Sequence, residues 1–178
     1  MVIFDLPDTD ISAQTIMQAT AKQFAGLIDR QKQKLPYCIK QAAKKYQLSE
    51  LLLKALLKQE GGAIGQVMRH SNGSVDYGPF QINRKFWLSQ IIHQYPDLTW
   101  VELAFDACTN TFVASAILRS EIDKAQGDIW RGVGNYHHAE SSNLVRHYEY
   151  TSGVIQQYVE LVQQKMNHIF VPTANGNQ

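Results

Sequence analysis

The sequence lacks long apolar runs and a strong net charge, and it has only two cysteines. No segment approaches the roughly 18 consecutive apolar residues that a membrane-spanning helix requires. A net charge of +1 gives no electrostatic reason to expect a nucleic-acid partner. Internal repeats and low-complexity tracts are absent as well. What remains, 178 residues of which 44% are hydrophobic and 19% charged, is typical of one soluble globular domain with a real core.

The first residues do not have the pattern of a secretory signal peptide. They carry Asp5, Asp8 and Asp10, with neither a basic start nor an apolar run. We therefore expect no signal peptide within these residues, and the sequence leaves any export route open.

The two cysteines, Cys38 and Cys108, permit two interpretations. They are either buried free thiols, which are common in cytosolic proteins, or one disulfide, which would place the protein in an oxidising compartment. Their number alone does not decide between these.

Hydrophobic periodicity and capping residues predict a mainly helical chain. Ser49 can cap a helix that carries the apolar residues of 52–57 and ends at Gly61-Gly62. A proline at position 36 predicts a break between two earlier helices. Further helices are expected at 11–34, 37–46, 84–93, from Thr99 through about 117 with a bend allowed near Thr109, 128–136 and 144–169.

One segment, residues 66–83, has a different character. Its Ser71-Asn72-Gly73-Ser74 stretch is a strong turn signal, and the Val75-Asp76-Tyr77 stretch that follows suits a short strand. We predict a small β-hairpin there.

Glu60 is the first candidate catalytic residue. In helical spacing it shares a face with Leu53, Leu56 and Leu57, so its carboxyl emerges where the apolar face ends. Burial and the negative end of the helix dipole both raise the pKa of such a carboxyl. A carboxylic acid with a pKa of about 6–7 could protonate a glycosidic oxygen at neutral pH. The alternative is a solvated glutamate at a helix end.

Asp76, in the predicted hairpin, supplies a second carboxyl in an unlike environment. Two such carboxyls are what glycosidic bond cleavage requires. Its alternative role is that of a polar strand residue bonded to the turn.

Both segments resemble a known family. Residues 52–60, LLKALLKQE, followed by residues 76–83, DYGPFQIN, are similar to the soluble lytic transglycosylases of peptidoglycan, above all to the type attached to conjugation and specialised secretion machines. The second segment is equally similar to the catalytic hairpin of animal C-type lysozymes. The resemblance covers about residues 36–165. It implies a mainly α, lysozyme-like fold with a small β-hairpin beside the active site, to which this chain adds an N-terminal helix.

The resemblance implies an activity. Such enzymes cleave the β-1,4 bond between N-acetylmuramic acid and N-acetylglucosamine. One glutamate, here Glu60, protonates the leaving oxygen and then takes the proton of the muramic acid 6-hydroxyl, which closes an anhydro ring without water. In lysozymes the carboxylate that corresponds to Asp76 supports or attacks the sugar cation, whereas many transglycosylases lack it. No cofactor is implied.

The resemblance also assigns roles to other residues. Gln81 and Asn83 fall in a segment whose amides face the substrate, with loop bracing as the alternative. Tyr77 and Phe80 could stack on sugar faces or pack in the core. Tyr136, in a motif similar to the family's Ala-Tyr-Asn segment, is expected beside the glutamate. Cys38 and Cys108 correspond to a pair of family cysteines, which favours the disulfide.

Asn110 is expected to brace a helix or loop, and the adjacent His137 and His138 have no metal-ligand spacing, so no metal site is predicted. Gly61, Pro79-Phe80 and Ala114 depart from the family pattern, but none of these changes removes the acid.

The expected organisation is an N-terminal extension at 1–35, a catalytic domain at 36–170 and a flexible tail at 171–178. The expected location is the periplasm or cell envelope, with peptidoglycan glycan strands and components of an envelope-spanning machine as partners. A water-using muramidase and a non-catalytic wall-binding assembly protein remain as alternatives.

Overall fold

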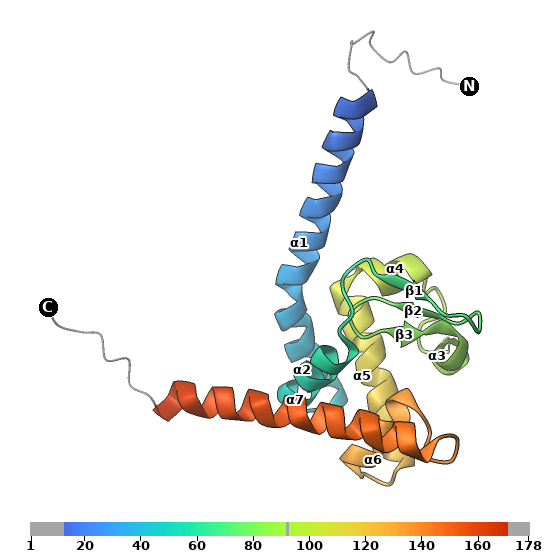
Figure 1. Cartoon of the computed structure of the whole chain (residues 1–178), viewed down its shortest axis with the longest axis vertical. Helices are drawn as coiled ribbons and strands as arrows, with labels where there is room; N and C mark the ends of the chain where they lie inside the picture. The colour runs from blue at the N-terminus through green and yellow to red at the C-terminus, as the bar shows by residue number, and fades with distance from the viewer. Residues whose placement is uncertain (1–12, 92, 171–178) are drawn as a thin grey trace, which may run out of the picture.

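The computed structural model describes residues 13–91 and 93–170. The first twelve residues of the predicted extension and the whole predicted tail lie outside this part. The described chain is mainly helical, as predicted, with one small antiparallel sheet (Figure 1). Its elements are α1 (Ala13–Tyr46), α2 (Glu50–Glu60), β1 (Val67–Arg69), β2 (Val75–Tyr77), β3 (Ile82–Asn83), α3 (Arg84–Ile91), α4 (Trp100–Phe105), α5 (Ala107–Lys124), α6 (Ile129–His137) and α7 (Leu144–Phe170).

Helix α1 runs through Pro36, so the predicted break there is wrong. A proline inside a helix removes one hydrogen bond and costs about 3 kcal/mol. Packing on both sides of Pro36 offsets this cost. Before it, the Phe24 ring packs edge-on against Phe105, and Gln31 Oε1 accepts a hydrogen bond from the Ala107 N–H. After it, α1 buries a row of apolar side chains, namely Cys38, Ile39, Ala42 and Ala43.

A disulfide joins Cys38 in α1 to Cys108 in α5. The pairing implied by the resemblance is therefore confirmed, and the free-thiol alternative is wrong. The bond closes a loop with a sequence separation of 70 and fixes the second half of α1 to the centre of the molecule.

Helix α2 has the boundaries that its caps predict. The Ser49 side chain accepts a hydrogen bond from the Leu52 N–H at 3.4 Å, and Gly61 ends the helix in the left-handed conformation with φ +62°. Leu52, Leu53, Ala55 and Leu56 are buried. The position of Glu60 on the last turn therefore follows from local sequence alone.

The predicted hairpin is present and carries one more strand. Strand β2 pairs with both β1 and β3, all antiparallel. In the β1–β2 register, Met68 lies opposite Asp76, while Val67 and Arg69 lie opposite Tyr77 and Val75. Because side chains alternate along a strand, Asp76 projects from one face of the sheet and Arg69 from the other.

The long helix predicted from Thr99 is two helices, α4 and α5, with Asp106 between them. The Asp106 side chain accepts a hydrogen bond from the Thr109 N–H at 2.6 Å and caps α5. The apolar pattern continues across this residue, which is why periodicity alone suggests one helix. The interruption thus lies three residues before the expected bend.

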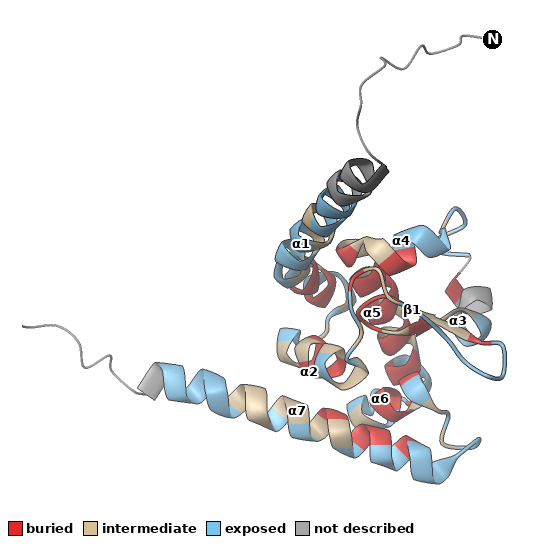
Figure 2. Ribbon diagram, turned by 45° about the horizontal axis from the view of Figure 1, so that its top comes forward, coloured by how far each residue is buried: buried red, intermediate tan, exposed pale blue. Residues whose placement is uncertain are grey.

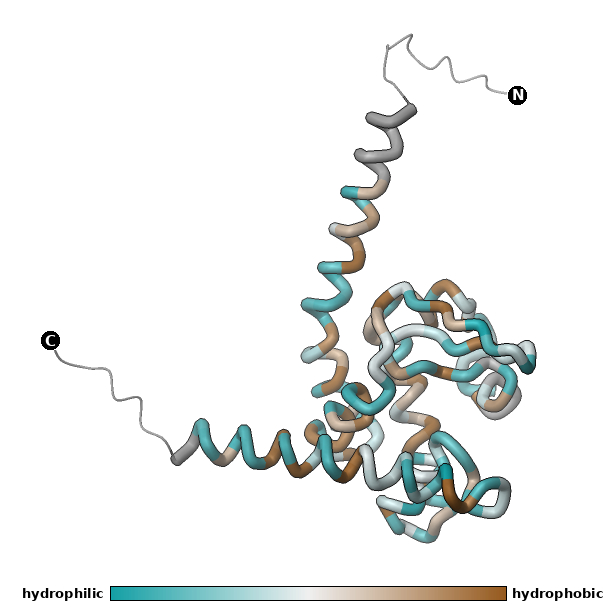
Figure 3. The backbone as a smooth tube through the Cα atoms, viewed as in Figure 1, coloured by the Kyte–Doolittle hydropathy of each residue, from teal (hydrophilic) through white to brown (hydrophobic). Residues whose placement is uncertain are grey.

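Helix α5 lies at the centre, and the buried residues of the other elements gather around it (Figure 2). The N-terminal part of α1 and the C-terminal part of α7 project from this core. Polar and apolar residues alternate along both projecting segments (Figure 3). Helices α6 and α7 have nearly the predicted bounds, and Asp128 caps α6 through the N–H groups of Trp130 and Arg131.

Candidate active site

Glu60 lies where the end of α2 meets α7. The Tyr150 hydroxyl, from α7, donates a hydrogen bond to Glu60 Oε1. The two helices approach closely, since a Cβ at Gly153 of α7 would overlap the Gln59 side chain. Among the described residues Tyr150 is the one hydrogen-bond donor to this carboxyl, so Oε2 is left to carry a proton.

The surroundings of Glu60 favour its neutral form. Burial raises its pKa to about 8, the Tyr150 hydrogen bond opposes this rise, and the negative charge of Asp76 adds to it. The side chain is nevertheless only half-buried, so it keeps contact with the surface. A carboxyl with this pKa is protonated at neutral pH and can act as a general acid.

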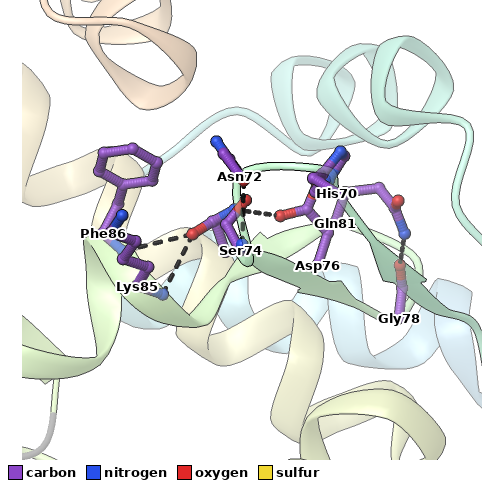
Figure 4. Close-up of polar contacts among 9 residues, drawn as sticks. His70, Asn72, Ser74, Asp76, Gly78, Gln81, Lys85 and Phe86 are labelled. Atoms are coloured by element: carbon purple, nitrogen blue, oxygen red, sulfur yellow. Dashed lines mark hydrogen bonds and ion pairs between the residues drawn. The ribbon is translucent and has the colours of Figure 1, made fainter.

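Asp76 has the opposite environment, because polar groups hold both of its oxygens. Oδ2 lies 2.5 Å from His70 Nε2, and Oδ1 accepts a hydrogen bond from Asn83 Nδ2 at 2.5 Å. The Asp76 and His70 side chains meet above the sheet (Figure 4). The site thus combines a carboxyl that burial shelters with one that polar groups hold, and the charge of Asp76 adds to the rise in the pKa of Glu60.

The two predicted amides are engaged with the protein. Asn83 Oδ1 accepts hydrogen bonds from the N–H groups of Lys85 and Phe86, which caps the start of α3. Gln81 Nε2 donates to the Gly78 carbonyl at 2.7 Å (Figure 4). Both amides therefore brace loops, which was the alternative to substrate binding. Substrate binding by either amide stays a prediction.

Gly62 explains how the end of α2 is fitted against the sheet. A Cβ at this position would overlap the carbonyl oxygens of Gly78 and Pro79 and the amide of Gln81. Only glycine permits this approach of the two backbones. The turn between β2 and β3 is therefore held against the segment that follows Glu60.

Asn110 fixes the same turn from the other side, in the bracing role expected for it. It is fully buried in α5, and its Nδ2 donates to the carbonyl oxygens of Tyr77 and Leu103 at 2.9 and 2.8 Å. Its Oδ1 accepts from the Phe80 N–H at 2.9 Å. One amide thus joins α5, the end of α4 and the β2–β3 turn.

Replacing Asn110 by Ala should lower the free energy of unfolding by about 2–3 kcal/mol, because three buried backbone groups would lose their partner. Urea unfolding measures this loss. Asn72→Ala is the control, since Asn72 is exposed and makes one local turn contact, to the Ser74 N–H. A loss equal to that of the control would contradict the bracing role.

The predicted aromatic residues are buried. Phe80 has no exposed surface and Tyr77 is 6% exposed, so both pack in the core and present no face to a sugar. This corrects the stacking role considered for them. Tyr136 is also buried and donates from its hydroxyl to the Phe80 carbonyl at 3.0 Å rather than to Glu60. Burial, and after it the charges of Glu60 and Asp76, raise its pKa, which places it near both carboxyls.

Sequence reasoning missed Tyr150, the residue that bonds to Glu60. A signal for its burial exists in the helical spacing of Tyr150, Val154, Tyr158 and Leu161, a stripe to which Tyr148 does not belong. Nothing in the sequence links that stripe to a glutamate 90 residues earlier. His137 stacks on the Tyr150 ring with centroids 4.5 Å apart.

The His137 stacked on Tyr150 is neutral at pH 7. Burial, His138 and the charge of Arg146 lower its pKa to about 4, against a smaller opposite effect of Asp76. Within residues 13–91 and 93–170 no group of three or more His, Cys, Asp or Glu side chains is placed to hold a metal ion.

A comparison with family models identifies the class of this chain. Residues 37–152 match the model described as the transglycosylase SLT domain, which is more than half of the chain. The chain belongs to this family. Its members are lytic transglycosylases, lyases that cleave peptidoglycan in the cell envelope. A search of curated proteins found no match to this transglycosylase.

The match begins one residue after Pro36, in the middle of α1, so part of this helix precedes the family domain. No helix in the described part of the transglycosylase is both long and apolar enough to cross a membrane.

Proposed function

We propose that this transglycosylase cleaves the β-1,4 bond between N-acetylmuramic acid and N-acetylglucosamine, with Glu60 first as general acid and then as base. The observation that carries the proposal is the placement of the Glu60 carboxyl, which is half-buried at the end of α2 and bonded to Tyr150, and whose pKa burial raises to about 8. Family membership supports peptidoglycan as the substrate.

The proposed reaction proceeds in two proton transfers. Protonated Glu60 gives its proton to the leaving oxygen as the bond to C1 of the muramic acid breaks, and positive charge develops at C1. The charge of Asp76 stabilises this cation across the site. The muramic acid 6-hydroxyl then bonds to C1 while Glu60, now a carboxylate, takes the hydroxyl proton. The products are an anhydro-muramic end and a free N-acetylglucosamine hydroxyl, and Glu60 regains its proton.

Digestion of purified sacculi tests the proposal through the masses of the released muropeptides. Anhydro ends are expected. Reducing ends would instead support a hydrolytic muramidase, an alternative favoured by the presence of Asp76 in an ionic setting near Glu60. If folded protein released nothing, the third alternative, a non-catalytic wall-binding protein, would replace both.

The electrostatics of Glu60 predict opposite pH shifts for two variants. Activity requires protonated Glu60, so kcat/KM should fall as pH rises through about 8. Tyr150→Phe removes a hydrogen bond that lowers this pKa and should move the alkaline limb upward. Asp76→Asn removes a charge that raises the pKa and should move the limb downward. The pH dependence of muropeptide release measures both shifts.

Tyr148→Phe is the matched control, because Tyr148 lies on the same helix and bonds to Glu140 instead. Its alkaline limb should coincide with that of the parent enzyme. The assigned roles would be contradicted if the alkaline limb of the pH profile moved in the same direction in Tyr150→Phe and Asp76→Asn.

The proposed cellular role is local wall opening in the periplasm or envelope for a secretion or conjugation machine. Its support is the sequence resemblance and the part of α1 that precedes residue 37. Leu27 is 51% exposed on that part and suits a partner contact. Leu27→Glu should leave release from isolated sacculi unchanged and reduce co-purification with envelope machinery. If the variant co-purified with envelope machinery as well as the parent does, the Leu27 face of α1 would not be the partner contact.

A further inference from the structure

A hollow lies between the β1–β2 hairpin and the first turns of α3 and α4, with a volume of about 600 Å³. Strand side chains, the hairpin turn and side chains from the two helices line it. Its lining residues are Val67, Arg69, Gly73, Ser74, Val75, Tyr77, Lys85 and Trp100.

This hollow belongs to the sheet face opposite Asp76. Arg69 lies across from Val75 and Val67 from Tyr77, so these four side chains share one face. Asp76 and Met68 share the other. A ligand in the hollow therefore does not compete for the position beside Glu60, and substitutions there leave the carboxyl pair untouched.

The residues that line the hollow suit a ligand with a negatively charged group and an apolar part. Arg69 and Lys85 are exposed, and within the described chain neither side chain forms an ion pair with a carboxylate. None of the lining residues is acidic. Trp100 is 51% exposed beside them and offers a flat apolar surface. The nearest acidic groups along the chain are engaged elsewhere, Asp76 with His70 and Glu102 with Thr99.

We propose that this hollow, named here the outer-face site, binds the peptide stem of peptidoglycan through the stem's carboxylates. This rests on the proposed function, because the stem is the anionic part of that polymer while the N-acetylglucosamine units are neutral. Arg69 suits bidentate carboxylate binding, Lys85 adds a second positive charge, and Trp100 covers the aliphatic part of the stem. The enzyme then holds the wall at two places, the glycan at Glu60 and a stem on the opposite sheet face.

Binding without cleavage tests the outer-face site. In the Glu60→Gln background, co-sedimentation measures the Kd for intact sacculi and for sacculi whose stems an amidase has removed. Arg69→Glu with Lys85→Glu should weaken binding to intact sacculi about tenfold or more, as expected for two lost charge contacts. Trp100→Ala should weaken it as well. Stem-free glycan keeps a lactyl carboxylate on each muramic acid, so a charge reversal has a general effect there, and the test pair should bind it as the control pair does.

Lys40→Glu with Lys44→Glu is the matched control, since it changes the net charge equally at two exposed residues of α1. Its Kd for intact sacculi should change much less than that of the test pair. Equal losses in the test and control pairs on intact sacculi, or a larger loss in the test pair that persists on stem-free glycan, would overturn the proposal. Arg69→Gln with Lys85→Gln repeats the test if the charge reversals do not fold.

The same experiment separates this proposal from the proposed function. Release of muropeptides by the enzyme with Glu60 intact is measured independently of binding. Stem-dependent binding without any release would refute the catalytic proposal alone, and release without stem-dependent binding would refute the outer-face site alone.

Discussion

Glu60→Gln is expected to reduce muropeptide release from sacculi by roughly 10²–10⁴-fold, the usual contribution of general acid–base catalysis. Glutamine has nearly the same shape and keeps an oxygen that can accept from the Tyr150 hydroxyl, but it has no proton to give. Mass spectrometry of the released muropeptides measures the effect. Glu50→Gln is the control on the same helix, because Glu50 is exposed at the opposite end, and its activity should be unchanged.

The same variant should be at least as stable as the parent. The folded-state pKa of Glu60 is raised from 4.5 to about 8, so the parent loses stability as pH rises through this window. The loss reaches at most a few kcal/mol at about 1.4 kcal/mol per pKa unit, and Glu60→Gln removes it. Turnover close to that of the parent in a folded Gln variant would place the acid at another residue.

Removal of the disulfide has the largest expected effect on stability. Cys38→Ala with Cys108→Ala opens a loop with a sequence separation of 70. On the chain-entropy model the free energy of unfolding should fall by about 4 kcal/mol. Thermal unfolding should show a Tm lower by about 10 °C, given the usual 2–4 °C per kcal/mol for a chain of this length.

Reductant provides the matching measurement. Dithiothreitol should lower the Tm of the parent toward that of the double variant and leave the variant unchanged. If the double variant lost less than about 1 kcal/mol, the bond would add little beyond the apolar packing of Ile39, Ala42 and Ala43 on α1.

Local signals were enough to predict the elements that carry the two carboxyls. Ser49 and Gly61 set the ends of α2, and the Asn72-Gly73 turn set the hairpin, because each acts on backbone only a few residues away. The apolar face of α2 in turn predicts a sheltered Glu60. The raised pKa agrees with this prediction and has burial as its main cause.

Three features of the structure depend on tertiary contacts that the sequence does not reveal. Helix α1 continues through Pro36 because α4 and α5 contact it before this residue and the disulfide to α5 holds it after, and Tyr150 reaches Glu60 from 90 residues away. The burial of Phe80 depends on the turn that Asn110 holds inside the core. Each of these outcomes requires knowledge of which distant segment lies opposite, and no local pattern supplies it.

The pKa of Glu60, measured from its side-chain carboxyl ¹³C shift in an NMR titration, tests the account most directly. The Gln variant assigns the signal. We expect a midpoint of about 8, so that the acid is protonated at neutral pH. A midpoint near 4.5, the ordinary value for a glutamate, would contradict it.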